Sequence, residues 1–252
     1  MRRLLPGLTA LLFVVVAADV AGRAFRERPS GVASPGAVLP AGVPDEGRAA
    51  ERRRAERDRA ARRTVRAALA DATGETYLDS LLLTTDSVLR RWPERGGYPL
   101  RVAMLERAPA AWEPSHAQFV RDALLAWQEA LATVRFQLVA DTTGADIVVR
   151  WLDRFTYDRA GQTDLTWDSR GEVRRATVSL ALFTGSGRPL PEDALRAVAI
   201  HEIGHALGLP HSPDSLDVMH PQTFVTALSS RDRASARLLY ALPAGPVHDR
   251  GR

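Results

Sequence analysis

The stretch from His201 to Ser212 constrains this chain more than any other part of its sequence. His201 and His205 are four residues apart, so in a helix both imidazoles lie on one face and can bind a single metal ion. Glu202 directly follows the first histidine, and from there its carboxylate can reach a water on that ion, as a general base must. The sequence therefore predicts a helix that carries a metal site.

A third histidine follows this helix at a spacing that brings it to the same ion. Gly208 comes three residues after His205, and glycine tolerates the positive φ that ends many helices. The chain can then turn back and present His211 as a third nitrogen ligand. Three neutral imidazoles with one open position are typical of a catalytic zinc site and not of a closed structural one. We therefore expect one Zn²⁺ ion held by His201, His205 and His211.

The same stretch resembles the signature of the metzincin zinc metallopeptidases, H-E-x-x-H-x-x-G-x-x-H, at every specified position. The resemblance is to the matrixin-like members and covers about residues 97–242. Met219, within the sequence DVMHP, resembles the methionine of the Met-turn, which packs beneath the metal in this family; an ordinary core methionine is the alternative. Ser212 is also the residue that matrixins carry directly after the third ligand.

The resemblance implies a zinc-dependent endopeptidase that hydrolyses peptide bonds of proteins or peptides. In such an enzyme Glu202 takes a proton from water and delivers it to the leaving amine. The substrate would lie extended along an edge strand at about residues 162–168. The alternative is an inactive, membrane-tethered zinc-binding module that holds a partner in its cleft. The presence of Glu202 argues against that alternative, because metal binding alone does not need this carboxylate.

The chain also departs from the matrixin pattern. It has no histidine between His116 and His201, so we expect no second, structural zinc site, and it has no cysteine for a cysteine switch. Thr223 stands where many matrixins have tyrosine, which predicts a differently shaped substrate pocket. His220 replaces another tyrosine; we expect an exposed turn residue there, and a polar group behind the metal ligands is the alternative. Four acidic residues offer the oxygen ligands that Ca²⁺ prefers, although solvated loop acids are the commoner interpretation; they are Asp153, Asp158, Asp164 and Asp168.

The N-terminal residues have the pattern of a secretory signal. A basic start, Met1-Arg2-Arg3, is followed by an apolar run from Leu8 to Ala18. This run is shorter than the ~20 residues that span a bilayer comfortably. Residues 1–21 therefore predict a signal peptide, with an uncleaved signal anchor as the alternative. Both predict an exported, extracytoplasmic protein that is either secreted or anchored to the membrane.

Between this signal and the main domain we expect a linker and an arginine-rich segment. Residues 22–47 are rich in proline, glycine and alanine, as linkers are. Residues 48–96 predict a helical segment. Its part from Arg48 to Arg66 holds nine arginines against three acids, a local charge of +6, whereas the whole chain carries +4. A solvated helix is the usual meaning of such a run, and a polybasic arm on anionic lipid is the alternative. Nucleic acid is not an expected partner, because interleaved aromatic residues are missing.

The main domain, residues 97–242, shows strands and helices in alternation. We expect a helix capped by Ser115, a hairpin-like pair at residues 162–167 and 176–183, and a metal-binding helix that begins at Pro191. Further strands are expected at residues 99–105, 134–139 and 145–152, a closing helix at residues 229–242 and a tail at residues 243–252. This order predicts an α+β fold. The resemblance implies that it is the metzincin-like zincin fold, with a twisted, mostly parallel sheet, an active-site helix and a C-terminal helix.

Overall fold

Short apolar segments form the strands of one central sheet. The computed structural model describes residues 23–24, 45–83, 87–105 and 109–248. The strand order is β1-β6-β7-β5-β3-β4; β6 and β7 are antiparallel, and every other neighbouring pair is parallel. The predicted α+β fold with a mostly parallel sheet is confirmed. The strands are β1 (Arg23–Ala24), β3 (Leu100–Met104), β4 (Phe136–Val139), β5 (Ile147–Leu152), β6 (Gly161–Trp167) and β7 (Val173–Ala181).

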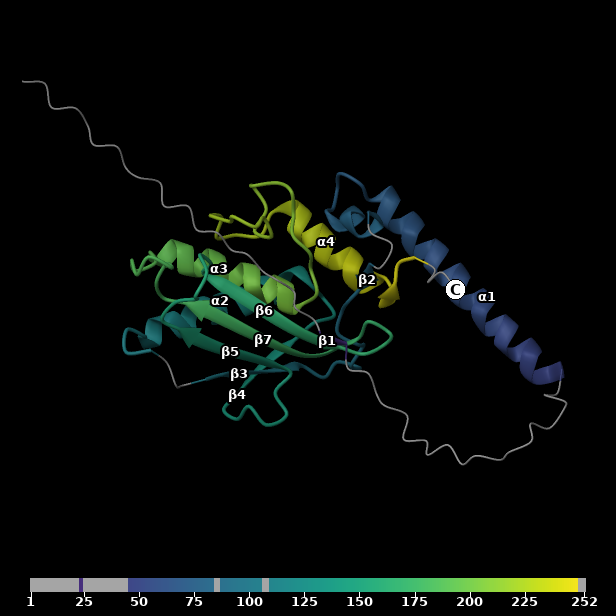
Figure 1. The fold of residues 1–252 in the computed structure, drawn as a ribbon, viewed down its shortest axis with the longest axis horizontal. Helices are drawn as coiled ribbons and strands as arrows, with labels where there is room; N and C mark the ends of the chain where they lie inside the picture. The colour runs from purple at the N-terminus through teal and green to yellow at the C-terminus, as the bar shows by residue number, and fades with distance from the viewer. Residues whose placement is uncertain (1–22, 25–44, 84–86, 106–108, 249–252) are drawn as a thin grey trace, which may run out of the picture.

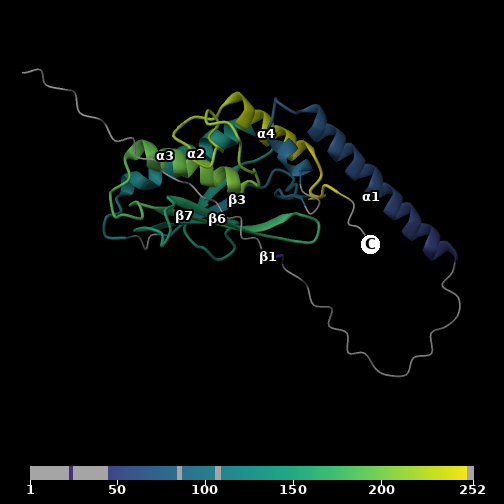
Figure 2. The same ribbon diagram turned by 45° about the horizontal axis from the view of Figure 1, so that its top comes forward.

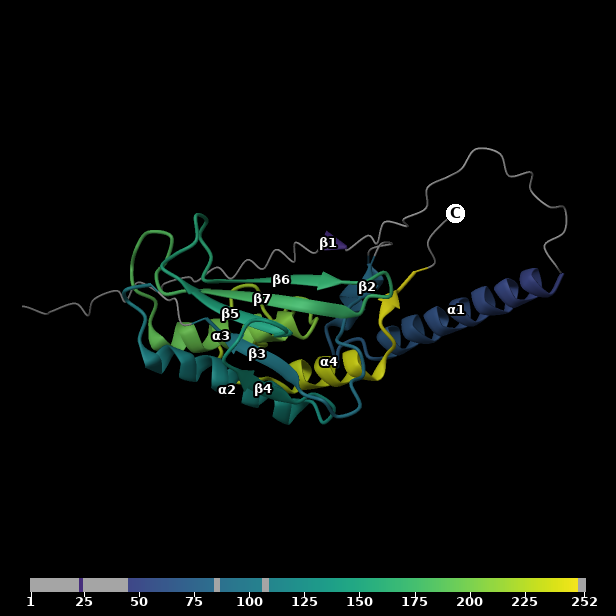
Figure 3. The same ribbon diagram turned by 90° about the horizontal axis from the view of Figure 1, so that it is seen from below.

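Two helices, α2 (Pro114–Ala130) and α3 (Glu192–Ala206), lie on the same side of this sheet (Figures 2 and 3). They pack against each other through Trp127, which is fully buried and whose indole N–H donates to the Ile200 carbonyl at 2.8 Å. Because an aromatic ring with a satisfied N–H fills this contact, α3 is held firmly against α2. The helical layer is thus the support on which the histidines of α3 are placed.

The predicted cap of α2 is wrong by two residues. The helix begins at Pro114, and its N-cap is Glu113 instead of Ser115. Proline suits the first helical position, where no backbone N–H is needed. The helix therefore starts at Pro114, and the residue before it, Glu113, is the N-cap. His116 accepts a hydrogen bond from the Glu113 backbone N–H through Nδ1 at 2.9 Å.

The segment before the main domain, predicted to be helical, contains a strand besides its helices. After α1 (Asp45–Asp71) come a short 3-10 helix, η1 (Leu78–Leu82), and the strand β2 (Val88–Leu89), which pairs antiparallel with β8 (Gly245–Pro246). Leu78 and Leu89 are fully buried in the same core as the sheet and helices. The segment therefore packs against the main domain, and residues 245–246 of the predicted tail form a strand.

The arginine-rich helix α1 extends away from the rest of the protein (Figures 1 and 3). Residues 50–61 are exposed on every side, whereas Val65 and Leu69, near its C-terminal end, are buried in the core. No helix in the described part of the chain is both long and apolar enough to cross a membrane. The predicted signal, residues 1–21, and most of the predicted linker lie outside the described residues.

The closing helix α4 (Ser230–Ala241) agrees with its prediction. Ser229 caps it by accepting a hydrogen bond from the Asp232 backbone N–H at 3.0 Å. The predicted hairpin-like pair is also confirmed as the antiparallel strands β6 and β7.

Candidate active site

Helix α3 is the buried element on which the site is built. Pro191 caps it, and Glu192 and Asp193 occupy its first turn, where acidic side chains favour the positive end of the helix dipole. Its second half, residues 197–206, is buried on all sides. His201 and His205 are therefore inside the protein, at 0% and 1% exposure.

The turn after α3 requires glycine for two reasons. The helix ends at Ala206, and Gly208 has a φ of +102°, in the left-handed region that other residues rarely adopt. A Cβ atom on Gly208 would also lie 2.1 Å from the Arg90 carbonyl oxygen. The predicted helix-ending glycine thus has the expected conformation, and a second contact that the sequence did not indicate.

The three histidines meet through their Nε2 atoms. The Nε2 of His205 lies 3.0 Å from that of His201 and 3.2 Å from that of His211. The Nδ1 of His201 contacts the Val218 carbonyl at 2.7 Å, and the Nδ1 of His205 contacts the Leu209 carbonyl at 2.8 Å. Because a carbonyl only accepts, each Nδ1 carries the hydrogen and each of these Nε2 atoms presents a lone pair.

These lone pairs fit a bound cation. Two unprotonated nitrogens cannot hydrogen-bond to each other, but they can share a metal ion. A tetrahedral zinc site with Zn–N distances of about 2.1 Å holds its nitrogens about 3.4 Å apart, close to the separations here. Burial lowers the pKa of His201 to about 3 and that of His205 well below its ordinary value, so both rings stay neutral, as metal ligands must.

Across the described residues, His201, His205 and His211 are the single group of histidines and acids that could hold a metal ion. The four aspartates that we considered for calcium do not form such a group there. Asp168, for example, accepts hydrogen bonds from the backbone N–H groups of Arg170 and Glu172 and from the Arg174 guanidinium. Its oxygens are used within its own turn.

Glu202 follows His201 on α3 and is fully buried. Its Oε2 accepts a hydrogen bond from the Thr163 hydroxyl at 2.6 Å, while Oε1 has no donor among the described residues. Burial raises the pKa of Glu202 to about 8, and the hydrogen bond from Thr163 opposes this rise. A nearby cation would also oppose it, because it favours the charged carboxylate.

Two residues of β6 that the sequence analysis missed hold this carboxylate. Thr163 donates to it, and Gly161 leaves the space that it fills, since a Cβ on Gly161 would lie 2.4 Å from the Glu202 Oε1. A glycine at the start of a strand is a known sign of close approach by another group. The sequence alone could not show that α3 is the neighbour.

Met219 packs against α3 at Gly204, between the two histidines of the helix. It is fully buried, and a Cβ on Gly204 would lie 2.3 Å from its sulfur atom. The Met219 carbonyl also accepts the backbone N–H of Ser212 at 2.9 Å, next to the third histidine. This is the packing expected for the methionine of a Met-turn. Thr223 is buried at 1% exposure, and its proposed effect on the substrate pocket stays a prediction.

Comparison with known proteins gives one family. The family model described as Matrixin, Peptidase_M10, matches residues 161–241, which run from β6 through α3 and the Met219 turn to α4. None of the curated proteins compared with the chain matches it. Residues 161–241 thus resemble the matrixins, and the three histidines within them are compatible with the zinc site of the H-E-x-x-H-x-x-G-x-x-H signature.

Proposed function

We propose that the protein is a zinc-dependent endopeptidase that hydrolyses peptide bonds of proteins or peptides. The observation that carries this proposal is the fully buried Glu202 carboxylate, which follows His201 on the helix that carries two of the three convergent imidazoles. A site that only bound metal would not need a buried acid with a raised pKa at this position. The matrixin match supports metallopeptidase activity in general.

His201, His205 and His211 would hold the zinc ion through Nε2. When bound there, zinc supplies Lewis-acid chemistry that polarises a carbonyl and makes water more acidic. Glu202 acts as general base: it takes a proton from the attacking water and then delivers this proton to the leaving amine. Because Thr163 engages Oε2, Oε1 is the oxygen left to exchange the proton.

The edge of β6 is the proposed place for the substrate backbone. In the described part of the chain, β6 pairs with β7 on one side and, on the other, only with β1 at Thr166 and Trp167. Residues Gly161 to Leu165 thus offer a strand edge to an extended peptide. Thr163 lies within this stretch and contacts Glu202, so a peptide added there would pass close to the general base.

Digestion of a mixed peptide library tests the proposal. The full chain, loaded with zinc, is compared with the Glu202→Ala variant, and the products are identified by mass spectrometry. Cleavage by the unaltered chain alone is expected. If both proteins bind zinc and neither cleaves any peptide, the inactive zinc-binding module becomes the better account.

We also propose that the enzyme works outside the cytoplasm. The basic start and apolar run of residues 1–21 support export. Fractionation of cells that express the full chain should find it in the extracytoplasmic or membrane fraction. Recovery in the cytoplasmic fraction would contradict this proposal.

A second proposed role belongs to α1, as an arm that binds anionic lipid. Its residues 50–61 are exposed on all sides, and several arginines lie among them. The full chain should bind vesicles that contain phosphatidylserine in a salt-sensitive way, and replacement of Arg52, Arg53 and Arg54 by glutamine should weaken this binding. Equal binding to neutral phosphatidylcholine vesicles would contradict it.

A further inference from the structure

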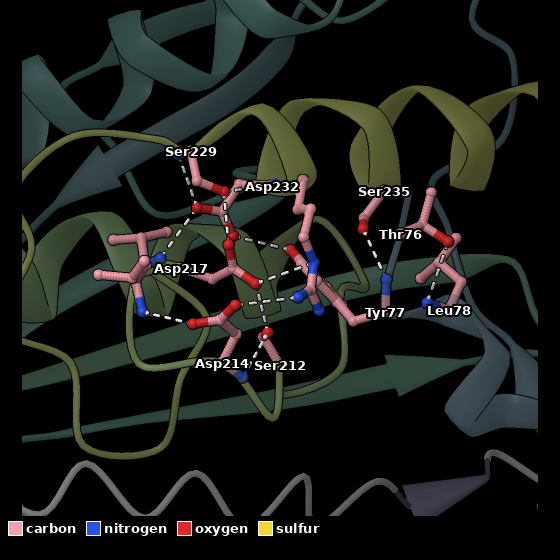
Figure 4. Close-up of polar contacts among 12 residues, drawn as sticks. Thr76, Tyr77, Leu78, Ser212, Asp214, Asp217, Ser229, Asp232 and Ser235 are labelled. Carbon is pink, nitrogen blue, oxygen red and sulfur yellow. Dashed lines mark hydrogen bonds and ion pairs between the residues drawn. The ribbon is translucent and has the colours of Figure 1, made fainter. Parts of the chain in front are cut away.

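A chain of buried polar contacts connects the segment before the main domain with helix α4 and the turn of Met219 (Figure 4). Its centre is Asp232, in the first turn of α4, whose side chain is fully buried. One carboxylate oxygen, Oδ2, accepts the backbone N–H groups of Val218 and Ser229, both at 2.9 Å. The other, Oδ1, accepts the Tyr77 hydroxyl at 3.1 Å. The same carboxylate therefore holds the start of α4 and the turn beneath the histidines.

Val218 carries this chain of contacts to the metal site. Its N–H donates to Asp232, and its carbonyl accepts the Nδ1–H of His201 at 2.7 Å. The Val218 side chain is fully buried as well, so its backbone is fixed by contacts on three sides. The orientation of the His201 ring, and with it the direction of its Nε2 lone pair, thus depends on where Asp232 holds Val218.

Tyr77 fixes Asp232 from the other side. Its ring is 1% exposed, and its hydroxyl is the one donor to Oδ1 within the described residues. Burial, followed by the charge of Asp232, raises the pKa of Tyr77 well above 10.0, so the hydroxyl keeps its proton at any working pH. Without this donor, one oxygen of the buried Asp232 carboxylate would have no partner. Because an unpaired buried oxygen is costly, the Asp232 side chain would then change its position or take up a proton.

We propose that Tyr77 is a positioning residue for the metal site: through Asp232 and Val218 it fixes the orientation of His201. The inference rests on the proposed function only in that it takes the three histidines to bind zinc. It makes residues 76–78 part of the working unit, although they precede the main domain that the sequence predicts from residue 97.

A neighbouring contact provides a matched control. The backbone N–H of Tyr77 donates to the Ser235 hydroxyl at 3.1 Å, one turn further along α4 (Figure 4). Ser235→Ala therefore also removes a buried hydrogen bond between this segment and α4. That bond does not lead to Val218 or His201, so its loss should affect stability without affecting the metal site.

The test is the zinc affinity of the full chain, measured by competition with a chromogenic chelator. Partners behind a metal ligand typically change affinity about 10- to 100-fold, and Tyr77 is two contacts further away. We therefore expect Tyr77→Phe to raise the zinc dissociation constant about 3- to 10-fold. Ser235→Ala should change it less than about 2-fold, since it leaves the His201 contacts in place. The visible spectrum of the Co²⁺-loaded protein should change in Tyr77→Phe and stay as in the unaltered chain in Ser235→Ala.

A second variant shows whether Tyr77 acts through Asp232. Asp232→Asn keeps an oxygen that can accept the two backbone N–H groups, but it turns a donor towards the Tyr77 oxygen. This variant should weaken zinc binding at least as much as Tyr77→Phe, and adding Tyr77→Phe to it should weaken binding no further. If Tyr77→Phe does not fold, a loss of affinity in Asp232→Asn that exceeds the loss in Ser235→Ala still supports the connection.

Equal effects of Tyr77→Phe and Ser235→Ala on zinc affinity would overturn the inference, as would fully additive effects of the two substitutions at Tyr77 and Asp232. Failure of the unaltered chain to bind zinc is a different result. It would overturn the proposed function itself, so the two failures can be told apart.

Discussion

The hydroxyl oxygen of Thr163 lies 2.6 Å from the Oε2 atom of Glu202, and both side chains are fully buried. This contact joins β6, the strand next to the edge strand β1, to the proposed general base. Hydrogen bonds to charged groups are among the strongest in proteins, and a buried one also fixes direction. The strand that would receive the substrate is thus in direct contact with the acid that would act on it.

Removal of this hydroxyl should slow the reaction. In Thr163→Val the shape of the side chain is kept, while a bond worth about 1.5 kcal/mol to the carboxylate is lost. We expect kcat to fall about tenfold with little change in KM, because the substrate contacts remain. Steady-state kinetics on a cleaved peptide measures this. Thr163→Ser, which keeps the hydroxyl, should stay near the unaltered rate; equal losses in the two variants would argue against the role of the hydrogen bond.

Enlargement of Gly161 should displace Glu202. A Cβ there would lie 2.4 Å from Oε1 and 2.6 Å from the Cγ of Glu202, and the buried carboxylate has no free space. Gly161→Ala should therefore lower the free energy of unfolding by about 1–3 kcal/mol and reduce kcat. Chemical denaturation and kinetics give the two quantities.

Gly185→Ala is the matched control for this prediction. A Cβ on Gly185 would meet its nearest neighbours, atoms of Asp158, at 3.5 Å, an ordinary contact distance. Its stability should stay within about 0.5 kcal/mol of the unaltered chain. If Gly161→Ala behaves like this control, Glu202 is not confined as the structure indicates.

The buried histidines and Glu202 should give the metal-free protein a stability maximum near neutral pH. The pKa of His201 falls from 6.5 to about 3 on folding, so the unfolded chain binds the proton more tightly and stability falls as the pH drops below about 6.5. The pKa of Glu202 rises from 4.5 to about 8, so the folded chain binds that proton more tightly and stability falls as the pH rises from about 4.5 to 8. The acidic side has the steeper slope, because burial also lowers the pKa values of His205 and His211.

Thermal unfolding with a chelator present, from pH 4 to pH 9, measures this profile. In Glu202→Gln the acid is replaced by a group that does not titrate, so the decline of Tm above about pH 6.5 should disappear while the acidic decline stays. Identical profiles for the two proteins would contradict the raised pKa of Glu202.

Much of the metal site could be predicted because its signals are local. The spacing of His201 and His205 depends only on helix geometry, and Gly208 marks the turn that brings His211 back. The strands β6 and β7 and the helix α4 were predicted for the same reason: their hydrophobic patterns and turn residues lie within each segment.

The features that the sequence did not predict depend on contacts between distant segments. Residues 78–92 have helical spacing, yet Val88 and Leu89 form a strand because they pair with Gly245 and Pro246. Thr163 and Gly161 gain their role only because β6 lies beside α3. Tyr77 likewise contacts an aspartate 155 residues away. At Val88 and Leu89, pairing with a distant strand overrides the local helical propensity. At Gly161, Thr163 and Tyr77, no local sequence pattern indicates the role.

The most direct test of the account measures bound zinc and peptide hydrolysis on the same samples of the full chain. The unaltered chain should hold one zinc ion and cleave. Glu202→Gln should hold zinc and not cleave, because the metal ligands remain and the base is lost. His205→Ala should do neither, because it removes the imidazole whose Nε2 lies between those of His201 and His211. Cleavage by Glu202→Gln at the rate of the unaltered chain, or full zinc occupancy in His205→Ala, would contradict the proposed active site.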